Sequence, residues 1–420
     1  MIFANGKLLP DSERKKVLTG LEKAINATRM GPPLESETVI AAVDALGRRL
    51  AGGEFDALLA RYLPAGATLA ELLPMLRRET LEQKLRTELG GAPFAAQTHG
   101  RTAARVLPLG TLLHVAAGNM PGLPVYSALE GLLTGNVNLV KLPHGDKGLS
   151  LAAFSLLVEQ EPRLAPYLCA FDLPSKEVVD IKLLASLADG IVTWGGDSAI
   201  QSLRAMAPAG CKLMEWGHRL GFAYVAGYED VEGELSALAR HIIGTNQRLC
   251  SSCQVIFLDS DNREEALSFC RIFLPYLEKA AEERPGPWAG AGASLSGHTA
   301  LLERIVEGRT EGEVHFPGRG CSVTFRPHGE LELSPMEGNV LVKLLPRRDL
   351  MGALRRQKGR LQTAGLLCAP EDREELTGLL ARAGLTRITR AGSMSDTFPG
   401  EGHDGEYPLR RYVRIVDVEG

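Results

Sequence analysis

The sequence predicts an α/β protein in which parallel sheets are covered by helices. From residue 109 onward, short apolar runs rich in β-branched residues alternate with longer helix-like stretches. This alternation is typical of strand–helix–strand units, whose strands lie parallel. The expected strands of the first block are Leu109–Ala117, Val137–Lys141, Leu168–Phe171, Gly190–Thr193 and Cys211–Met214. The expected helices between them are Val125–Leu133, Leu149–Glu159, Lys176–Leu187 and Ala199–Ala205.

The flanking segments have different patterns. Charged amphipathic stretches separated by Pro/Gly breaks predict four helices ahead of residue 91, namely Glu13–Ala27, Leu34–Ala51, Phe55–Tyr62 and Leu69–Leu89. The small, polar run Gly90–Arg105 is typical of a projecting hairpin or a linker. A second alternating block extends from Phe222 to about Arg390, and the polar tail that follows ends in a strand-like run, Arg411–Val418.

Size and composition narrow the function classes. The chain has 420 residues and is 45% hydrophobic, enough for two domains with cores of their own. A net charge of −4 without a long basic run argues against nucleic acid as a partner. The first residues lack the pattern of a signal peptide, and the uncharged run Val106–Leu129 contains three prolines, which disfavours a membrane span. We therefore expect a soluble, cytoplasmic protein.

One cysteine stands out as a candidate nucleophile. Cys250 lies in the polar run 246–254, between a helix-like segment and the strand-like segment Val255–Leu258. Reactive groups are often carried on such loops, although an isolated cysteine is more often a buried packing residue. Cys253 completes a C-x-x-C pair, which would suit zinc or redox chemistry. Zinc needs a second ligand pair, and the other five cysteines are not spaced to supply it, so no metal is expected.

The usual glycine-rich phosphate signatures are absent from the sequence. Neither a G-x-G-x-x-G after a strand nor a G-x-x-x-x-G-K is present. A nucleotide site in this chain would have to be of another kind.

Five stretches, in order, resemble motifs of the aldehyde dehydrogenase superfamily. They are residues 109–121, 134–141, 194–197, 214–217 and 246–250. Within the superfamily, the run Cys250-Ser251-Ser252 followed by Gln254, together with the late Gly402–Gly405, is most similar to the acyl-CoA reductase branch of the LuxC type.

The resemblance implies a fold and a domain plan. An aldehyde-dehydrogenase-like chain has a Rossmann-type cofactor domain, an α/β catalytic domain and a small oligomerisation arm. Here the cofactor domain would comprise residues 1–90 and 108–217, the catalytic domain 218–390, and the arm 91–107 with 391–420. The strands of the arm would pair across a homodimer, or within a homotetramer.

The resemblance also implies a reaction, the NADPH-dependent reduction of a long-chain fatty acyl-CoA or other acyl thioester to the aldehyde. Cys250 would carry the acyl group as a thioester. The side-chain amide of Asn119 and the backbone N–H of Cys250 would stabilise the oxyanion. Glu215 occupies the position of a general base that activates water, but it could instead assist thiol deprotonation or be an ion-paired carboxylate. Arg248 could lower the pKa of the thiol.

Cofactor residues follow by the same resemblance. Lys141 would bind the hydroxyls of the adenosine ribose, and the turn Trp194-Gly195-Gly196 the pyrophosphate. Glu332 would bind the nicotinamide ribose, although the spacing of its motif is one residue short. The nearby His144 and Lys147 favour NADPH over NADH. Without the resemblance, Lys141 would be interpreted as a solvated lysine that closes a strand, and Trp194-Gly195-Gly196 as an ordinary strand-to-helix turn.

Other functions remain open from the sequence. One is a CoA-acylating or hydrolytic aldehyde dehydrogenase that works in the oxidative direction. Another is a cysteine acyltransferase or thioesterase, which has no use for a dinucleotide. The acyl donor could be CoA, a carrier protein or an acyl-transferring partner protein. His403 and Asp404 would orient the active site or cap a turn.

Overall fold

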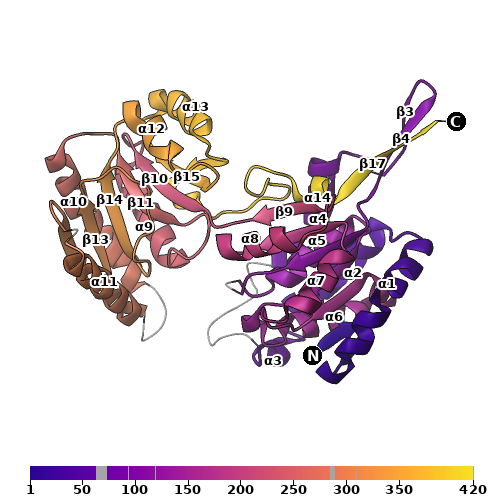
Figure 1. Ribbon diagram of the computed structural model, residues 1–420. Coiled ribbons are helices and arrows are strands. Elements are labelled where there is room, and N and C mark those ends of the chain that lie inside the picture. The colour runs from indigo at the N-terminus through magenta and orange to yellow at the C-terminus, as the bar shows by residue number, and fades with distance from the viewer. Residues whose placement is uncertain (63–72, 93, 119, 284–288, 309, 420) are drawn as a thin grey trace. The chain divides into compact units, whose positions relative to one another are not determined.

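The contacts of the chain divide it after Gly217. In the computed structural model, which describes residues 1–62, 73–92, 94–118, 120–283, 289–308 and 310–419, unit 1 comprises Met1–Gly217 with Phe398–Gly420, and unit 2 comprises His218–Thr397. Each unit is built on a seven-stranded sheet (Figure 1). The expected boundary at residue 391 is displaced, because Ala391 and Met394 are buried in the core of unit 2.

The sheet of unit 1 has the strand order β2-β1-β7-β6-β5-β8-β9. The strands are β1 Ile2–Ala4, β2 Lys7–Leu9, β5 Thr111–Val115, β6 Val137–Lys141, β7 Leu168–Phe171, β8 Gly190–Trp194 and β9 Lys212–Trp216. Strands β5 to β9 pair in parallel, and β1 and β2 extend the β7 edge in antiparallel pairing. The edge pair was not anticipated, since strands of three residues carry too little periodicity to be recognised.

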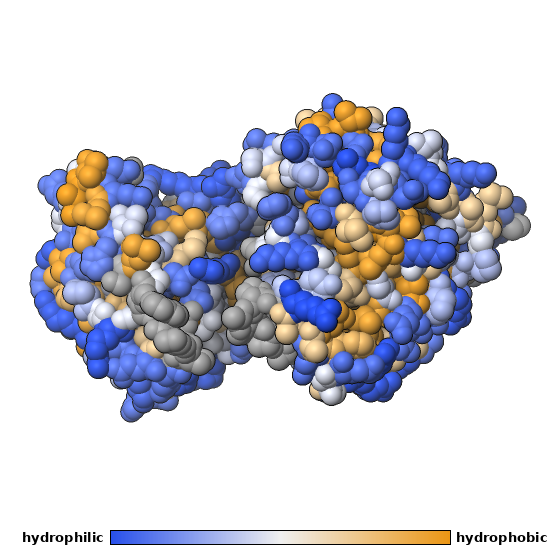
Figure 2. Space-filling view, turned by 90° about the horizontal axis from the view of Figure 1, so that it is seen from below, coloured by the Kyte–Doolittle hydropathy of each residue, from blue (hydrophilic) through white to orange (hydrophobic). Residues whose placement is uncertain are grey.

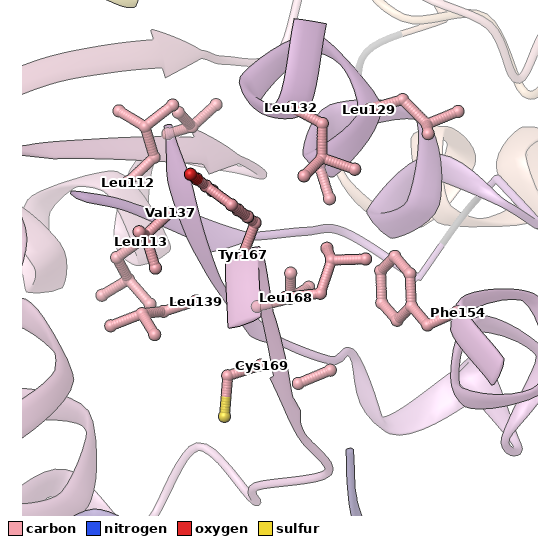
Figure 3. Packing of buried hydrophobic residues seen from close by; sticks show 14 of the residues in the cluster. Leu112, Leu113, Leu129, Leu132, Val137, Leu139, Phe154, Tyr167, Leu168 and Cys169 are labelled. Atoms are coloured by element: carbon pink, nitrogen blue, oxygen red, sulfur yellow. The ribbon is translucent and has the colours of Figure 1, made fainter. Parts of the chain in front are cut away.

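Helices cover this sheet and bury its apolar strands. They are α1 Arg14–Met30, α2 Ser36–Ala51, α3 Asp56–Leu59, α4 Arg78–Leu89, α5 Leu123–Leu133, α6 Leu149–Gln160, α7 Val178–Ser186 and α8 Asp197–Met206. Leucines of β5, β6 and α5 pack with Phe154 of α6 in the core (Figure 3). The helix expected over 69–89 begins only at Arg78, after a 3-10 turn at Leu73–Leu76 that contains Pro74; residues 69–72 lie outside the described ranges.

A small antiparallel sheet projects from unit 1 (Figure 1). It joins β3 Gln97–His99 and β4 Thr102–Pro108 to the carboxy-terminal strand β17 Val413–Glu419. The register runs from Val413 opposite Pro108 to Glu419 opposite Thr102. The short helix α14 Pro408–Arg411 leads into β17.

Unit 2 has a sheet of order β12-β13-β14-β11-β10-β15-β16, parallel except for β12. Its strands are β10 Leu220–Val225, β11 Cys253–Leu258, β12 Val314–Gly318, β13 Cys321–Arg326, β14 Asn339–Leu344, β15 Leu361–Leu367 and β16 Arg387–Arg390. Its helices are α9 Val231–Thr245, α10 Arg263–Glu282, α11 Ala289–Val306, α12 Leu350–Arg355 and α13 Arg373–Ala383. Alternate residues of β10 and β11 belong to different buried clusters, so both faces of the sheet are covered.

Short 3-10 turns punctuate both units. They are Asp11–Glu13, Leu73–Leu76, His144–Asp146, Pro162–Tyr167, Arg347–Asp349, Pro370–Asp372 and Ala391–Ser393. No helix within the described ranges combines the length and the apolar character needed to cross a membrane.

A buried ionic cluster ties the carboxy-terminal segment to the core of unit 1. Lys84 Nζ lies 2.6 Å from Glu88 Oε1 and 2.9 Å from Glu130 Oε1, and all three side chains are almost completely buried. The other carboxylate oxygen of Glu88 accepts a hydrogen bond from the Leu409 N–H at 2.7 Å. The Tyr412 hydroxyl donates to Glu130 at 3.4 Å. Burial raises the pKa of Glu88 despite the neighbouring ammonium. The amino-terminal end of helix α14 is therefore anchored by a buried hydrogen bond to a carboxylate of the ionic cluster.

We expect Glu88→Ala to lower the free energy of unfolding by about 3 kcal/mol, because it weakens a buried ion pair and leaves the Leu409 N–H without its acceptor. Urea unfolding followed by tryptophan fluorescence measures the change. Glu88→Gln is the control, since its amide oxygen can still accept from Leu409, and it should lose less. Equal urea midpoints for both variants and the wild type would contradict this account.

Candidate functional site

The parallel strands of unit 1 bring three of the predicted residues to the side of the sheet where the carboxyl ends of its parallel strands lie. Strand β5 lies in the middle, β6 and β7 follow on one side, and β8 and β9 on the other. This reversal creates a topological switch point between β5 and β8, and ligands of such sheets bind beyond the carboxyl ends of the strands. Lys141 is the last residue of β6, Trp194 is the last of β8, and Glu215 lies one residue before the end of β9.

Lys141 is a buried cation at this edge. Its side chain is only slightly exposed, and its Nζ donates to Ser175 Oγ at 3.4 Å. Burial lowers the pKa of Lys141, whereas the charge of Asp172 opposes the shift. The alternative of a solvated lysine does not describe this residue. A partly desolvated ammonium at a strand end is suited to donate hydrogen bonds to ligand hydroxyls.

The turn after β8 leaves backbone accessible. A side chain placed at Gly196 would meet no atom within 4 Å, and Gly196 immediately precedes α8. The Gly195 N–H donates to the Trp216 carbonyl at 3.2 Å, so it helps to hold the turn against β9. Helix amino termini favour anions. Asp197 places a carboxylate in the first turn of α8, which weakens that preference.

A chain of hydrogen bonds beneath the turn fixes Trp194. Its Nε1 donates to Ser127 Oγ at 3.0 Å, Ser127 Oγ lies 2.7 Å from His114 Nδ1, and His114 Nε2 lies 2.9 Å from Asn138 Oδ1. Because Asn138 Oδ1 accepts, His114 carries its proton on Nε2 and accepts the Ser127 hydroxyl proton on Nδ1. Burial lowers the pKa of His114 to about 4, so the ring is neutral at pH 7.

His403 packs against the two tryptophans next to this turn. Its ring centroid lies 5.0 Å from that of Trp194 and 4.8 Å from that of Trp216. Its backbone forms reciprocal hydrogen bonds with Glu406 across a tight turn in which Asp404 has a φ of 51°. His403 therefore belongs to a turn and also packs against the predicted cofactor residue Trp194.

Glu215 is part of an ion pair. Arg204 of α8 donates to both carboxylate oxygens of Glu215 through its Nε and a terminal guanidinium nitrogen, each at 2.5 Å. Of the three roles considered from the sequence, the structure displays the ion-paired carboxylate.

In unit 2, Cys250 lies on the expected loop between α9 and β11. Its side chain is half-buried. The loop begins with two consecutive left-handed residues, Asn246 at φ 52° and Gln247 at φ 59°. Such conformations are unfavourable for non-glycine residues, so the surrounding contacts must enforce them.

Two buried glutamines enforce the conformation of this loop. The side-chain amide of Gln247 donates to the Cys253 carbonyl at 3.0 Å and accepts from the Gly338 N–H at 3.1 Å. The Gln254 amide donates to the Gln247 carbonyl at 2.7 Å. Its oxygen accepts from the hydroxyl of Ser334 at 2.8 Å and from its N–H at 3.2 Å. The glutamines were not assigned roles from the sequence, where only the position of Gln254 after the cysteine run was visible.

The segment that these glutamines contact is itself unusual. Met336, Glu337 and Gly338 all have left-handed φ values, of 63°, 55° and 87°. The Glu337 carboxylate pairs with Arg248 at 2.5 Å. The positive charge of Arg248 is thus paired with the Glu337 carboxylate, and its action on the Cys250 thiol stays a prediction.

Cys253 is a packing residue. It is fully buried, and burial raises the pKa of its thiol to about 12. Its N–H donates to His241 Nε2 at 3.3 Å. Across the residues that the structure describes, no group of three or more His, Cys, Asp or Glu side chains is arranged to hold a metal ion.

Glu332 contacts two cations of unit 2. Its carboxylate pairs with Arg326 at 2.9 Å and with the buried Lys343. Although burial favours the neutral acid, these two charges lower the pKa of Glu332 overall. Asn119, the predicted oxyanion donor, lies outside the described residues.

Comparisons with known proteins agree with this architecture. The sequence profile of the family "Acyl-CoA reductase (LuxC)" matches residues 33–415. Long-chain acyl-protein thioester reductase 2 of Photobacterium leiognathi is 24% identical over 332 residues, which cover 76% of this chain and 66% of that protein. The reductase of Vibrio harveyi is 24% identical over 344 residues, covering 79% and 69%. The chain thus spans about two thirds of the length of these relatives.

Solved structures show the fold. Methylmalonate-semialdehyde dehydrogenase from Oceanimonas doudoroffii superposes with a TM-score of 0.73 at 12% identity, covering 99% of this chain and 97% of that one. Aldehyde dehydrogenase 21 from Physcomitrella patens gives 0.71 at 12% identity, covering 98% and 90%. The predicted aldehyde-dehydrogenase-like fold is confirmed.

We expect Gln254→Ala to cost about 1–3 kcal/mol of unfolding free energy, because it leaves the buried Gln247 carbonyl and the Ser334 N–H without partners. Hydrogen exchange over residues 246–254 should become faster, since the loop loses its support. The matched control is Gln201→Ala on the exposed face of α8, which should change stability by less than about 0.5 kcal/mol. Unchanged exchange in the Gln254 variant would remove its role as a support of the loop.

His114 makes the stability of unit 1 depend on pH. Its folded pKa of about 4 lies below the ordinary value of 6.5, so the unfolded chain binds the proton first. The contribution of His114 to the free energy of unfolding is therefore fully present above pH 6.5. It decreases as the pH falls toward 4, with a slope approaching about 1.4 kcal/mol per pH unit.

Fluorescence of Trp194 and Trp216, both in unit 1, can follow urea unfolding across this pH range. His114→Gln should unfold at lower urea concentration at every pH but show a shallower pH dependence. A slope equal to that of the wild type would show that another group is responsible.

Proposed function

Because the chain belongs to the acyl-CoA reductase (LuxC) family, we propose that it reduces an acyl thioester to an aldehyde through an acyl-cysteine intermediate on Cys250. The observation that carries the proposal is the Cys250 loop. A half-buried thiol is presented on a conformation that buried amides enforce, while the neighbouring Cys253 is buried and inert. This is the arrangement expected of a nucleophile rather than of a packing pair.

In the first half-reaction, the Cys250 thiolate attacks the acyl carbonyl carbon. A carbon–sulfur bond to Cys250 forms, and the carbon–sulfur bond to the donor breaks when the tetrahedral intermediate collapses. The donor leaves as a thiolate, which takes up the proton that the Cys250 thiol gave up. Negative charge develops on the carbonyl oxygen, which the Cys250 N–H and the Asn119 amide would stabilise. A side-chain donor of this kind contributes about 2.7–4 kcal/mol at the transition state.

The second half-reaction needs a hydride, which bound NADPH would supply to the thioester carbon. The residues at the switch point of unit 1 fit such a cofactor: Lys141 would bind the adenosine ribose, and the open Trp194–Gly196 turn the pyrophosphate. Exposed His144 and Lys147 follow β6 and favour a 2′-phosphate. Glu332 would bind the nicotinamide ribose. The Cys250 sulfur then leaves the thiohemiacetal as a thiolate, and the aldehyde is released.

The rival hydrolytic functions depend on Glu215 as a base for water. Its two oxygens are both engaged by Arg204, so a turn toward water would break a bidentate ion pair. This favours reduction over hydrolysis. A cysteine acyltransferase would leave the switch point of unit 1 without a role.

The acyl donor and the assembly belong to the same proposal. The relatives are named acyl-protein thioester reductases, which supports a protein-bound thioester as well as acyl-CoA as donor. We expect the small sheet of β3, β4 and β17 to join subunits of a homo-oligomer. Strand β17 is the terminal strand in the order β17-β4-β3, so among the described residues its outer edge has no partner strand and is suited to pairing.

We expect acyl-CoA to add one acyl group to the wild-type protein and none to Cys250→Ala, as measured by intact mass. Adding NADPH should discharge the adduct as aldehyde, and NADH should do so more slowly. Cys211→Ala is the matched control, because Cys211 is also half-buried, and it should acylate normally.

Other outcomes point to the alternatives. An adduct lost as free acid without nucleotide would indicate a thioesterase and a hydrolytic role for Glu215. Absence of an adduct from the folded wild-type protein would show that Cys250 does not attack acyl-CoA.

A further inference from the structure

Helix α5 of unit 1 has an apolar face and a polar face. Val125 and Leu129 line an apolar pocket among α2, α3 and α6, and Figure 2 shows apolar side chains gathered on the side of unit 1 that it views. Ser127 and Glu130 lie on the other face of the helix, and both are almost completely buried. Burial of a hydroxyl and a carboxylate is unfavourable unless hydrogen bonds replace the lost hydration. The role of the polar face therefore follows from the partners of these two side chains.

Ser127 is the residue at which three other side chains meet. Its Oγ accepts a hydrogen bond from Trp194 Nε1 at 3.0 Å and donates to His114 Nδ1 at 2.7 Å. Its third partner is the hydroxyl of Tyr412, which also lies 3.4 Å from Glu130 Oε2. A serine hydroxyl has one proton and two lone pairs, so these three partners use its whole hydrogen-bonding capacity. The orientation of Ser127 therefore depends on all three.

Tyr412 is itself held firmly. Its carbonyl accepts hydrogen bonds from the Leu109 N–H at 2.9 Å and from the side-chain amide of Asn136 at 3.0 Å. Its ring is completely buried and meets the ring of His114 edge-on, with 6.2 Å between the centroids. Because backbone and ring are both fixed, the hydroxyl of Tyr412 is a rigid support for Ser127.

The opposite end of this chain of hydrogen bonds is the turn that follows β8. The indole of Trp194 has one donor, Nε1, and Ser127 accepts it. We propose that Tyr412 is a positioning residue for the nucleotide: through Ser127 it fixes the indole of Trp194, and with it the turn Trp194–Gly196. The inference rests on the proposed function, in which this turn binds the pyrophosphate. Since Tyr412 immediately precedes β17, that strand and the turn would share one support.

The test is a double-mutant cycle on nucleotide affinity. Tyr412→Phe removes the hydroxyl and keeps the ring, and Ser127→Ala removes the side chain through which Tyr412 would act. We expect each change to raise the Kd for NADPH, measured by calorimetric titration, by about fivefold, since a supporting hydrogen bond is lost. The double variant should bind NADPH no more weakly than Ser127→Ala, because the proposed effect of Tyr412 passes through Ser127.

Tyr167→Phe is the matched control. Tyr167 is also a buried tyrosine of unit 1, and its hydroxyl donates to the Pro32 carbonyl at 3.0 Å. Among the described residues, no hydrogen bond joins the side chain of Tyr167 to Ser127 or Trp194, so its loss should leave the Kd within about twofold. A second readout is acylation of Cys250 by decanoyl-CoA without nucleotide, measured by intact mass. It should proceed in Tyr412→Phe at the wild-type rate, because this half-reaction does not use the turn.

The outcomes separate this inference from the proposed function. An unchanged Kd for NADPH in folded Tyr412→Phe would overturn the inference and leave the reductase activity standing. A double variant that binds much more weakly than Ser127→Ala would do the same. If Tyr412→Phe does not fold, Ser127→Ala decides alone: a raised Kd supports the route to Trp194, and an unchanged Kd removes it.

Failure of the proposed function is visible in the wild type. If the wild type binds NADPH but forms no aldehyde, the reductase proposal fails, and the mutant cycle still decides the role of Tyr412. If the wild type binds neither NADPH nor NADH, the nucleotide site is wrong and the inference falls with it.

Discussion

The common direction of the parallel strands is the constraint on which the candidate site of unit 1 depends. Because β5 to β9 all run the same way, residues far apart in sequence that end these strands meet at one edge. Lys141, Trp194 and Glu215 occupy that edge for this reason alone. Both faces of each sheet are covered by helices, so its edges and strand ends remain as places where polar side chains can act without disturbing the core.

Polar groups placed inside this framework have to be satisfied, and the same hydrogen bonds position the candidate residues. The Ser127–His114–Asn138 chain holds Trp194, and the Gln247 and Gln254 amides hold the Cys250 loop. The loop is nevertheless not relaxed. Two left-handed residues cost about 1 kcal/mol or more each, and the buried Asn246 Oδ1 finds no hydrogen-bond partner among the described residues. Local strain supported by a rigid surround is characteristic of functional loops.

Sequence patterns predicted the elements with strong periodicity and missed the features that arise only from tertiary contact. The strands Val137–Lys141 and Leu168–Phe171 were placed to the residue, because buried parallel strands read as continuous apolar runs. The three-residue strands β1 and β2 and the association of Ala391 with unit 2 were not visible, since each depends on a distant partner. For the same reason, the pairing of Glu215 with Arg204 and the amide bridges of Gln247 could not be read from the chain. The loop position of Cys250 could be, because it follows from local pattern.

Which reaction the proposed active site catalyses depends on what happens to one intermediate, the acyl-cysteine. An acyl-cysteine is common to aldehyde oxidation, thioester hydrolysis and thioester reduction, so the attacking thiol does not distinguish them. What distinguishes them is whether water, a thiol or a hydride reaches the acyl carbon. Water needs a base with a lone pair directed at it, and Arg204 engages both oxygens of the carboxylate that would serve. If Glu215 were that base in the proposed reaction, its pairing with Arg204 would disfavour hydrolysis of the acyl-enzyme without any change at the cysteine. In the proposed reaction, the fate of the acyl group would therefore depend on the partner of this carboxylate as well as on the thiol that carries the acyl group.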